Sequence, residues 1–162
     1  ATAGTYSVTV TNSYGCSSTA LTTVALPMAA SCSSNGGSQQ YEYIDYVSIG
    51  SISRNSGADA GGYYDGTTLV TTVAPGSNYT LTVSPGFANV NYLETWIIYI
   101  DWNGDGDFDD ANEIASVLLT LGSGNYTATI NVPSTSTFGY VRMRVSMQFL
   151  LPAGACVTLG YG

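Results

Sequence analysis

The run Trp96-Ile97-Ile98-Tyr99-Ile100 is apolar at five successive positions and leads directly into an acidic stretch that begins at Asp101. A strand that is apolar on both faces belongs inside a sheet that is covered on both sides. We therefore expect this run to form the central strand of the fold and the middle of its core.

Elsewhere apolar and polar residues alternate, which is the period of a half-buried β-strand. The alternation is clearest in three segments, whose apolar members are Tyr6, Val8 and Val10, then Tyr79, Leu81 and Val83, then Val141, Met143 and Val145. Further strands are expected around residues 19–26, 43–53, 67–73, 114–120 and 125–132. No stretch shows helical periodicity. The sequence predicts an all-β fold, an antiparallel β-sandwich of the Ig-like or jelly-roll-like kind.

The chain divides at a polar stretch rich in Gly and Ser, residues 31–40, which has the composition of a linker. Residues 1–30 are expected to be an N-terminal arm with two strand candidates, and residues 41–162 the globular sandwich. The sequence begins at Ala1 and not at Met, as expected of a processed chain or of a piece excised from a larger one.

Composition excludes several classes of function. The 162 residues include 3 Lys+Arg, 11 Asp+Glu and no His, for a net charge of -8, and all three cations are arginines. Without imidazole or lysine amine the chain is not expected to be an enzyme. Nucleic acid and membrane surfaces are unsuitable partners because both need a cationic face, and no apolar run is long enough for membrane insertion. Cysteines without lysine suggest a secreted or cell-surface protein.

The acidic stretch holds six of the eleven acidic residues between Asp101 and Glu113. Asp101, Asn103 and Asp105 followed by Gly106 match the first half of an EF-hand-type loop, in which alternate oxygen ligands converge on one Ca²⁺. The second half departs from that pattern, because the acidic residue expected at the twelfth position comes one residue later, at Glu113.

We therefore predict a structural Ca²⁺ loop at the end of a strand. Its candidate ligands are Asp101, Asn103, Asp105, Asp107, Asp109 and Glu113. The alternative is a solvated acidic hairpin, in which Asn103-Gly104 and Asp105-Gly106 are only turn dipeptides.

Two other groups of side chains suggest contacts. Arg142 and Arg144 lie on one face of an expected strand and should pair with carboxylates such as Glu94 or those of the acidic loop. The 13 tyrosines suit either a face that binds glycans or ordinary strand positions.

Several motifs resemble the GEVED domain of bacterial secreted and surface proteins over about residues 41–162. They are Ile100-Asp101-Trp102-Asn103, Asp105-Gly106-Asp107-Phe108, Pro133, Gly139, Arg142-Met143-Arg144-Val145, Cys156 and Tyr161-Gly162. The resemblance implies a β-sandwich that serves as an accessory or terminal module without an activity of its own. The acidic closing strand of that family has no counterpart before residue 162, so the sandwich is expected to lack one strand.

The N-terminal arm could supply such a strand. Donor-strand complementation by Tyr6, Val8 and Val10 would complete the sheet of the next copy and make a head-to-tail homopolymer. The stretch Gly4–Cys16 also resembles the last strand of the Ig-like repeats of bacterial adhesins. On that reading the chain is an adhesin or carbohydrate-binding module cut from a larger protein. A third possibility folds the arm on its own body.

Three cysteines leave one thiol without a partner in the chain. The family pattern supports Cys32 with Cys156, which would tie the two ends of the sandwich together, and Cys16 with Cys32 is the alternative. In the first case Cys16 is free or forms an intermolecular bond.

Overall fold

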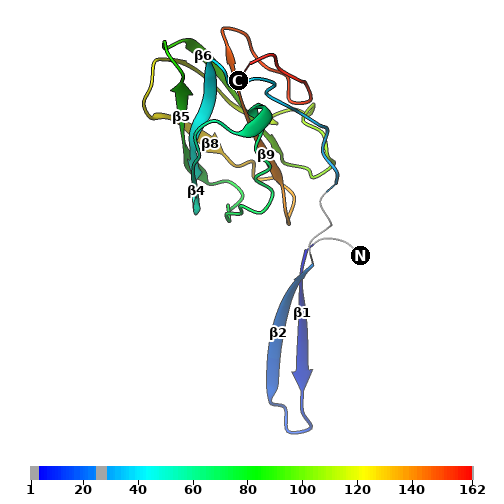
Figure 1. Cartoon of the computed structure of the whole chain (residues 1–162). Coiled ribbons are helices and arrows are strands. Elements are labelled where there is room, and N and C mark those ends of the chain that lie inside the picture. The colour runs from blue at the N-terminus through cyan, green and yellow to red at the C-terminus, as the bar shows by residue number, and fades with distance from the viewer. Residues whose placement is uncertain (1–3, 25–28, 162) are drawn as a thin grey trace.

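The structure is a computed structural model that describes residues 4–24 and 29–161 (Figure 1). Its strands are β1 (Gly4–Thr11), β2 (Ser17–Val24), β3 (Glu42–Ile49), β4 (Ile52–Asn55), β5 (Asn78–Phe87), β6 (Leu93–Asp101), β7 (Ile114–Leu121), β8 (Tyr126–Asn131) and β9 (Arg142–Phe149). A 3-10 turn, η1 (Ala60–Gly62), follows β4. Among the described residues there is no helix with the length and apolarity that a membrane crossing requires. The fold is all-β, as predicted.

Two antiparallel sheets form the sandwich. The strand order is β4-β3-β5-β8 in one sheet and β7-β6-β9 in the other. Strands β7 and β8 follow each other in the chain and contact each other, so they close one side of the sandwich. The other two edge strands, β4 and β9, therefore lie on the opposite side, where one sheet has a strand fewer than the other.

Strand β6 is the centre of the core, and every residue from Glu94 to Asp101 is buried. On one face of β6, Trp96, Ile98 and Ile100 pack against the other sheet, in the main hydrophobic cluster. On the opposite face, Ile97 and Tyr99 belong to a second cluster with Phe108 and Ala155. The doubly covered central strand predicted from the sequence is confirmed.

The stretch 31–40 does more than connect the arm to the sandwich. A disulfide joins Cys32 to Cys156, as the family pattern suggested, with a sequence separation of 124. Parallel β-bridges also join Asn35 to Thr158 and Ser38 to Tyr161. These contacts use sulfur and main-chain atoms, so the polar Gly/Ser composition of the stretch gave no sign of them.

Two strand predictions need correction. The segment 43–53 is a hairpin and not one strand, because Gly50, with φ +57°, turns the chain between β3 and β4. The segment 67–73 forms no strand; Thr71 instead accepts a hydrogen bond from the main chain of Ser51 through its hydroxyl (2.9 Å). Its β-branched composition is typical of strands, but it has no neighbouring strand to pair with in the described sheets.

Strands β1 and β2 form a separate antiparallel hairpin that extends away from the sandwich (Figure 1). Its turn is fixed by Asn12, whose side-chain oxygen accepts hydrogen bonds from the main-chain N–H groups of Tyr14 (2.9 Å) and Cys16 (3.0 Å). The hairpin of the arm is therefore not folded on its own sandwich (Figure 1). The end of the strand expected at 19–26 lies outside the described residues.

Candidate functional site

The acidic loop connects β6 to β7 and is organised around Asp101. This residue ends β6 and is buried, and its carboxylate accepts hydrogen bonds from the main-chain N–H groups of Gly104 (2.6 Å), Asp105 (3.2 Å) and Gly106 (3.0 Å). Gly106 has φ +101°, and a Cβ there would lie 2.9 Å from the carbonyl oxygen of Ala30. The loop can therefore fold back over Asp101 only with glycine at this position.

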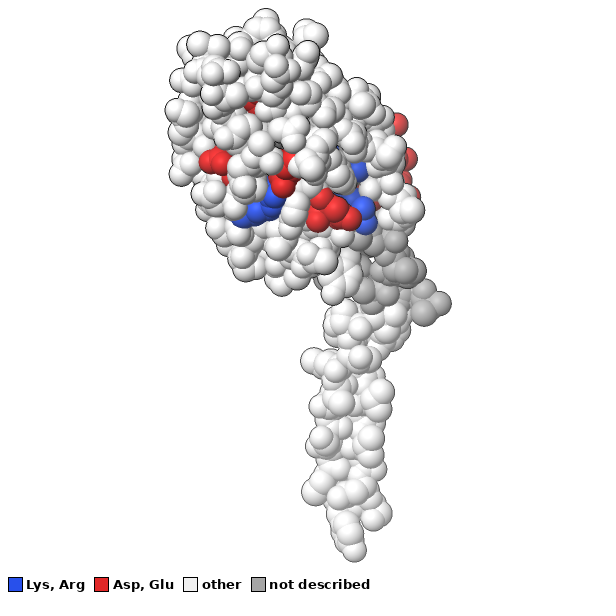
Figure 2. Space-filling model, viewed as in Figure 1, with Lys and Arg blue, Asp and Glu red and all other residues white. Residues whose placement is uncertain are grey.

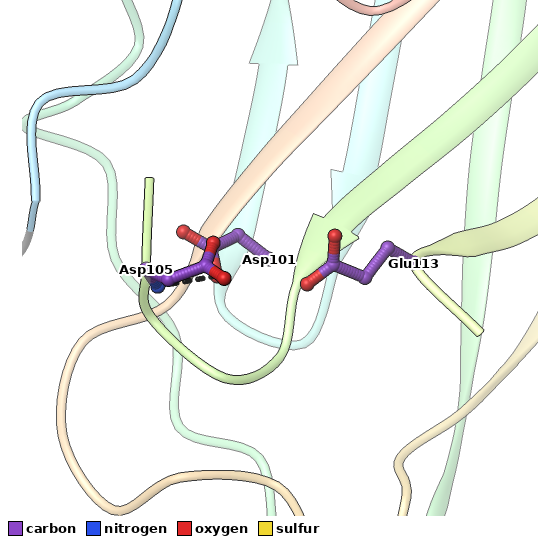
Figure 3. Close-up of side chains that lie close together, drawn as sticks. All are labelled: Asp101, Asp105 and Glu113. Carbon is purple, nitrogen blue, oxygen red and sulfur yellow. Dashed lines mark hydrogen bonds between the residues drawn. The ribbon is translucent and has the colours of Figure 1, made fainter. Parts of the chain in front are cut away.

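Three of the predicted ligands meet at the base of the loop. Carboxylate oxygens of Asp101, Asp105 and Glu113 lie within 4.8 Å of one another (Figure 3). Glu113 is 1% exposed; one of its oxygens accepts a hydrogen bond from the main-chain N–H of Asp110 (3.2 Å), and the other, Oε1, is buried without a partner. Carboxylate oxygens grouped in this way, one of them without a protein partner, are the ligand type that a hard cation such as Ca²⁺ takes.

The other predicted ligands, Asp107, Asn103 and Asp109, do not belong to this group of three carboxylates. Asp107 belongs to a second, exposed group with Asp105 and Asp110. Asn103 donates hydrogen bonds from its amide nitrogen to the carboxylates of Asp105 (2.9 Å) and Asp110 (2.6 Å), and its amide oxygen accepts one from the main-chain N–H of Asp105 (3.0 Å). Asp109 belongs to neither group of carboxylates.

Asp110 was missed from the sequence. The alternation that selected positions 101 to 109 ends in a turn at residues 110–112, where Asn112 has φ +73°. After that turn the chain no longer presents every second side chain to the same point. The only sign of Asp110 in the sequence is its place three residues before Glu113, which is the spacing of a turn.

Electrostatics at the loop favour a bound cation. Burial raises the pKa of Glu113 above its ordinary value, and the charges of Asp101, Asp110 and Asp105 raise it further. The ion pair between Arg54 and Asp59 lies far from this loop in sequence. A bound cation would offset the mutual repulsion of these carboxylates.

The arginines of β9 support the outer layer of the sandwich. Arg144 donates hydrogen bonds to the main-chain carbonyls of Cys32 and Ala155, and its guanidinium lies 5.0 Å from the centre of the Phe108 ring. Arg142 donates to the hydroxyl of Ser31 (3.0 Å). The expected pairing of Arg144 with Glu94 is wrong, since Arg144 lies on the outer face and both carboxylate oxygens of Glu94 are buried without a hydrogen-bond partner.

A groove of about 600 Å³ opens on the side of the sandwich between β4 and β9. Both sheets supply its apolar walls, through Ile44, Val47, Ile52, Val141, Met143 and Val145. The segment 62–73 lines the rest of the groove. It contains residues 67–73, which were expected to form a strand and do not. At its rim Arg54 pairs with Asp59 and lies 3.5 Å from the centre of the Tyr64 ring.

The hairpin carries an exposed apolar face. Tyr6, Val8 and Val10 are 45%, 60% and 66% exposed and lie on the same side of β1. The other side of the hairpin carries mostly hydroxyls, among which Thr9 bonds to Thr19 (2.9 Å), together with the exposed Leu21. Residues 4–24 contain no charged side chain, and Figure 2 shows the hairpin entirely white.

The fold and the loop together define a β-sandwich module with an acidic loop between two strands of its smaller sheet. Residues 95–162 match the model of the GEVED domain, which supports the family that the sequence motifs resemble. The matched residues include the acidic loop, β9 and Cys156. No curated protein and no solved structure matched the chain.

Proposed function

We propose that this protein is an extracellular, non-enzymatic structural subunit that forms filaments by lending strand β1 to another copy of itself. The observation that carries the proposal is the uncharged hairpin with an exposed apolar face. A two-stranded hairpin alone is only marginally stable in water, and exposed strand edges normally carry charges that prevent pairing. A hairpin without charges that exposes Val8 and Val10 is suited to joining another sheet.

The energetics are favourable for such an assembly. Burying the exposed side chains of β1 would contribute roughly 1.5–3 kcal/mol each before ordering costs, and new main-chain hydrogen bonds would add to this. Because the donated strand and the accepting edge are different surfaces, the contact is heterologous and continues from copy to copy as a filament. The Cys32–Cys156 disulfide supports an oxidising, extracellular location.

Substitution of Val8 tests the donor strand. Val8→Lys is expected to leave the protein monomeric, since it places a charge on the apolar face, whereas Ser7→Lys, on the opposite face of the same strand, should assemble as the wild type does. Light scattering and electron microscopy measure the outcome, in a Cys16→Ser background that removes the exposed free thiol. A wild-type chain that stays monomeric at high concentration, or equal assembly of both lysine variants, contradicts the proposal.

We further propose that Ca²⁺ binds at Asp101, Asp105 and Glu113 and braces the loop. Ca²⁺ takes six to eight oxygen ligands. Asp105 also belongs to the exposed group with Asp107 and Asp110, so the carboxylates of these two residues lie close enough to supply further ligands. A divalent cation would partner the buried Oε1 of Glu113 and neutralise the cluster. Its role would be structural.

Chelation tests the calcium site. At a Ca²⁺ concentration about 100 times its Kd, binding adds about 3 kcal/mol to the stability, so we expect a chelator to lower Tm on the order of 10 °C. Glu113→Gln should abolish this difference and Asp109→Asn, outside both carboxylate groups, should preserve it. Differential scanning calorimetry with and without chelator measures it, and a Tm indifferent to Ca²⁺ in the wild type rules the site out.

An adhesin or carbohydrate-binding module is the second candidate. Tyr63 and Tyr64 are 43% and 44% exposed at the groove, beside Arg54 and Asp59, and aromatic rings with hydrogen-bonding groups suit a sugar. Specific binding on a glycan array that Tyr64→Ala abolishes, in a protein that remains monomeric, would favour this function over assembly.

A further inference from the structure

We propose that the groove between β4 and β9 is the acceptor site, and that strand β1 of a second copy lies along the outer edge of β9 with its apolar face in the groove. This inference rests on the proposed function and names the surface that the donated strand occupies. The assembled sheet would run β2-β1 of one copy, then β9-β6-β7 of the next.

The architecture leaves room for one strand at this position. The β4-β3-β5-β8 sheet is wider than the β7-β6-β9 sheet by one strand, and the shared β7–β8 side places that deficit beyond β9. The side chains of Ile44, Val47 and Ile52 on the wider sheet are consequently only partly buried. A strand added beside β9 would give the smaller sheet the same width and cover these side chains.

The donor matches the acceptor in length and period. Strands β1 and β9 each contain eight residues. Alternate side chains of a strand point to one face, so Val8 and Val10 would enter the groove together while Ser7 and Thr9 face solvent. The groove walls at Met143 and Val145 on β9 have the same period and are apolar.

Charge also favours the hairpin as the occupant. Figure 2 shows acidic and basic side chains gathered on the sandwich, and Arg54, Asp59 and Asp65 lie at the groove. A strand without charges can enter beside them without burying an unpaired ion. The hairpin extends away from its own sandwich, so its apolar face is presented to other molecules and not to this groove (Figure 1).

The segment 62–73 lines the groove and would yield to the incoming strand. It has no strand partner in the described sheets, and it is held to the sandwich through side chains: Ser51 bonds to Thr71 (2.9 Å) and to the carbonyl of Val70 (3.2 Å), and Tyr63 bonds to Arg144. Val70 is 59% and Leu69 38% exposed, so this part of the segment is only partly packed, whereas Val73 at its end packs against the core cluster. Strand addition beside β9 would replace these few contacts by a continuous ladder.

A competing acceptor exists on β7. Val117, Leu119 and Leu121 are 59%, 65% and 70% exposed on the outer face of that edge strand. They form an open patch and no groove, and the edge of β7 faces β8, so strand addition there is obstructed. The patch provides the matched control for the acceptor assignment.

Photo-cross-linking from position 8 tests the assignment without altering the acceptor. Benzoylphenylalanine replaces Val8 in one copy, an isotope-labelled wild-type copy is mixed in, and mass spectrometry locates the adducts. Adducts in residues 139–149 or 44–54 of the labelled copy are expected, with few from the same probe at position 7. Adducts concentrated in residues 114–121, or in the hairpin of the other copy, overturn the proposal.

Complementation gives the second measurement. Val8→Lys removes the donor and Ile52→Lys alters the acceptor, so each should be monomeric alone, while an equimolar mixture should form one-to-one dimers. Leu119→Lys should assemble as the wild type does. The Tm of the Ile52→Lys chain shows whether it is folded. If the wild type forms filaments and a folded Ile52→Lys chain assembles equally well, the acceptor assignment fails and the proposed function stands. If the wild type does not assemble, the proposed function itself fails. If Ile52→Lys does not fold, the cross-links decide.

Discussion

Replacing Cys32 and Cys156 together by alanine is expected to lower the free energy of unfolding by about 4 to 5 kcal/mol. The disulfide closes a loop with a sequence separation of 124, and long loops lose the most chain entropy when they are cross-linked. This bond also holds both segments that cover the outer face of β6. Without it, the contacts of Arg144 to the carbonyls of Cys32 and Ala155 must hold that layer alone.

Urea unfolding at equilibrium measures this change, with Cys16→Ser as the control. Cys16 lies in the exposed hairpin turn and forms no disulfide, so its replacement should leave the unfolding midpoint of the sandwich unchanged. We expect Ile97 and Tyr99, on the outer face of β6, to become accessible before the inner core does. Retention of wild-type stability by the double alanine variant would show that the disulfide adds nothing to the fold.

The core was predictable because its signals are local. The run Trp96–Ile100 is apolar on both faces, and the structure places it in the middle strand of a sheet with a hydrophobic cluster on each face. Period-two alternation likewise identified the segments that became β1, β5 and β9. Burial of alternate side chains leaves this trace in any sequence that folds as a sandwich.

What the sequence could not reveal depends on main-chain partners. The stretch 31–40 has the composition of a linker, yet two β-bridges hold it to the C-terminal segment, beside the disulfide that the family pattern did suggest. The segment 67–73 has the composition of a strand, yet no neighbour pairs with it. Whether a backbone finds a partner depends on chain topology, which composition does not encode.

The acidic loop lies between these cases. Alternation correctly grouped Asp101 with Asp105, and the late Glu113 does reach them. Asp110 was not foreseeable, because a turn at 110–112 changes which side chains face inward. The deep burial of Asp101 and Glu113 was equally hidden, since charged residues are expected at the surface unless they are paired or bind metal.

A second pair of buried carboxylates lies at another point of the core, between the sheets. Glu42 of β3 and Glu94 of β6 are 3% and 0% exposed, and neither forms an ion pair within the described residues. Glu42 accepts a hydrogen bond from the main-chain N–H of Phe149, while both oxygens of Glu94 lack a partner. Burial, together with the smaller effect of the nearby charge of Glu42, raises the pKa of Glu94 from 4.5 to about 7.

Stability is therefore expected to fall as the pH rises from about 4.5 to about 7. The folded protein keeps a proton on Glu94 that the unfolded chain releases in this range, so deprotonation favours unfolding, by about 3 kcal/mol in all. Glu94→Gln cannot release that proton and should flatten this part of the pH profile. Urea unfolding of both proteins at intervals between pH 4.5 and 8, with chelator present throughout, measures the difference in slope. Glu113 is present in both proteins and contributes equally to both pH profiles, so a difference in slope reports on Glu94. Identical slopes would mean that Glu94 is already ionised in the folded core.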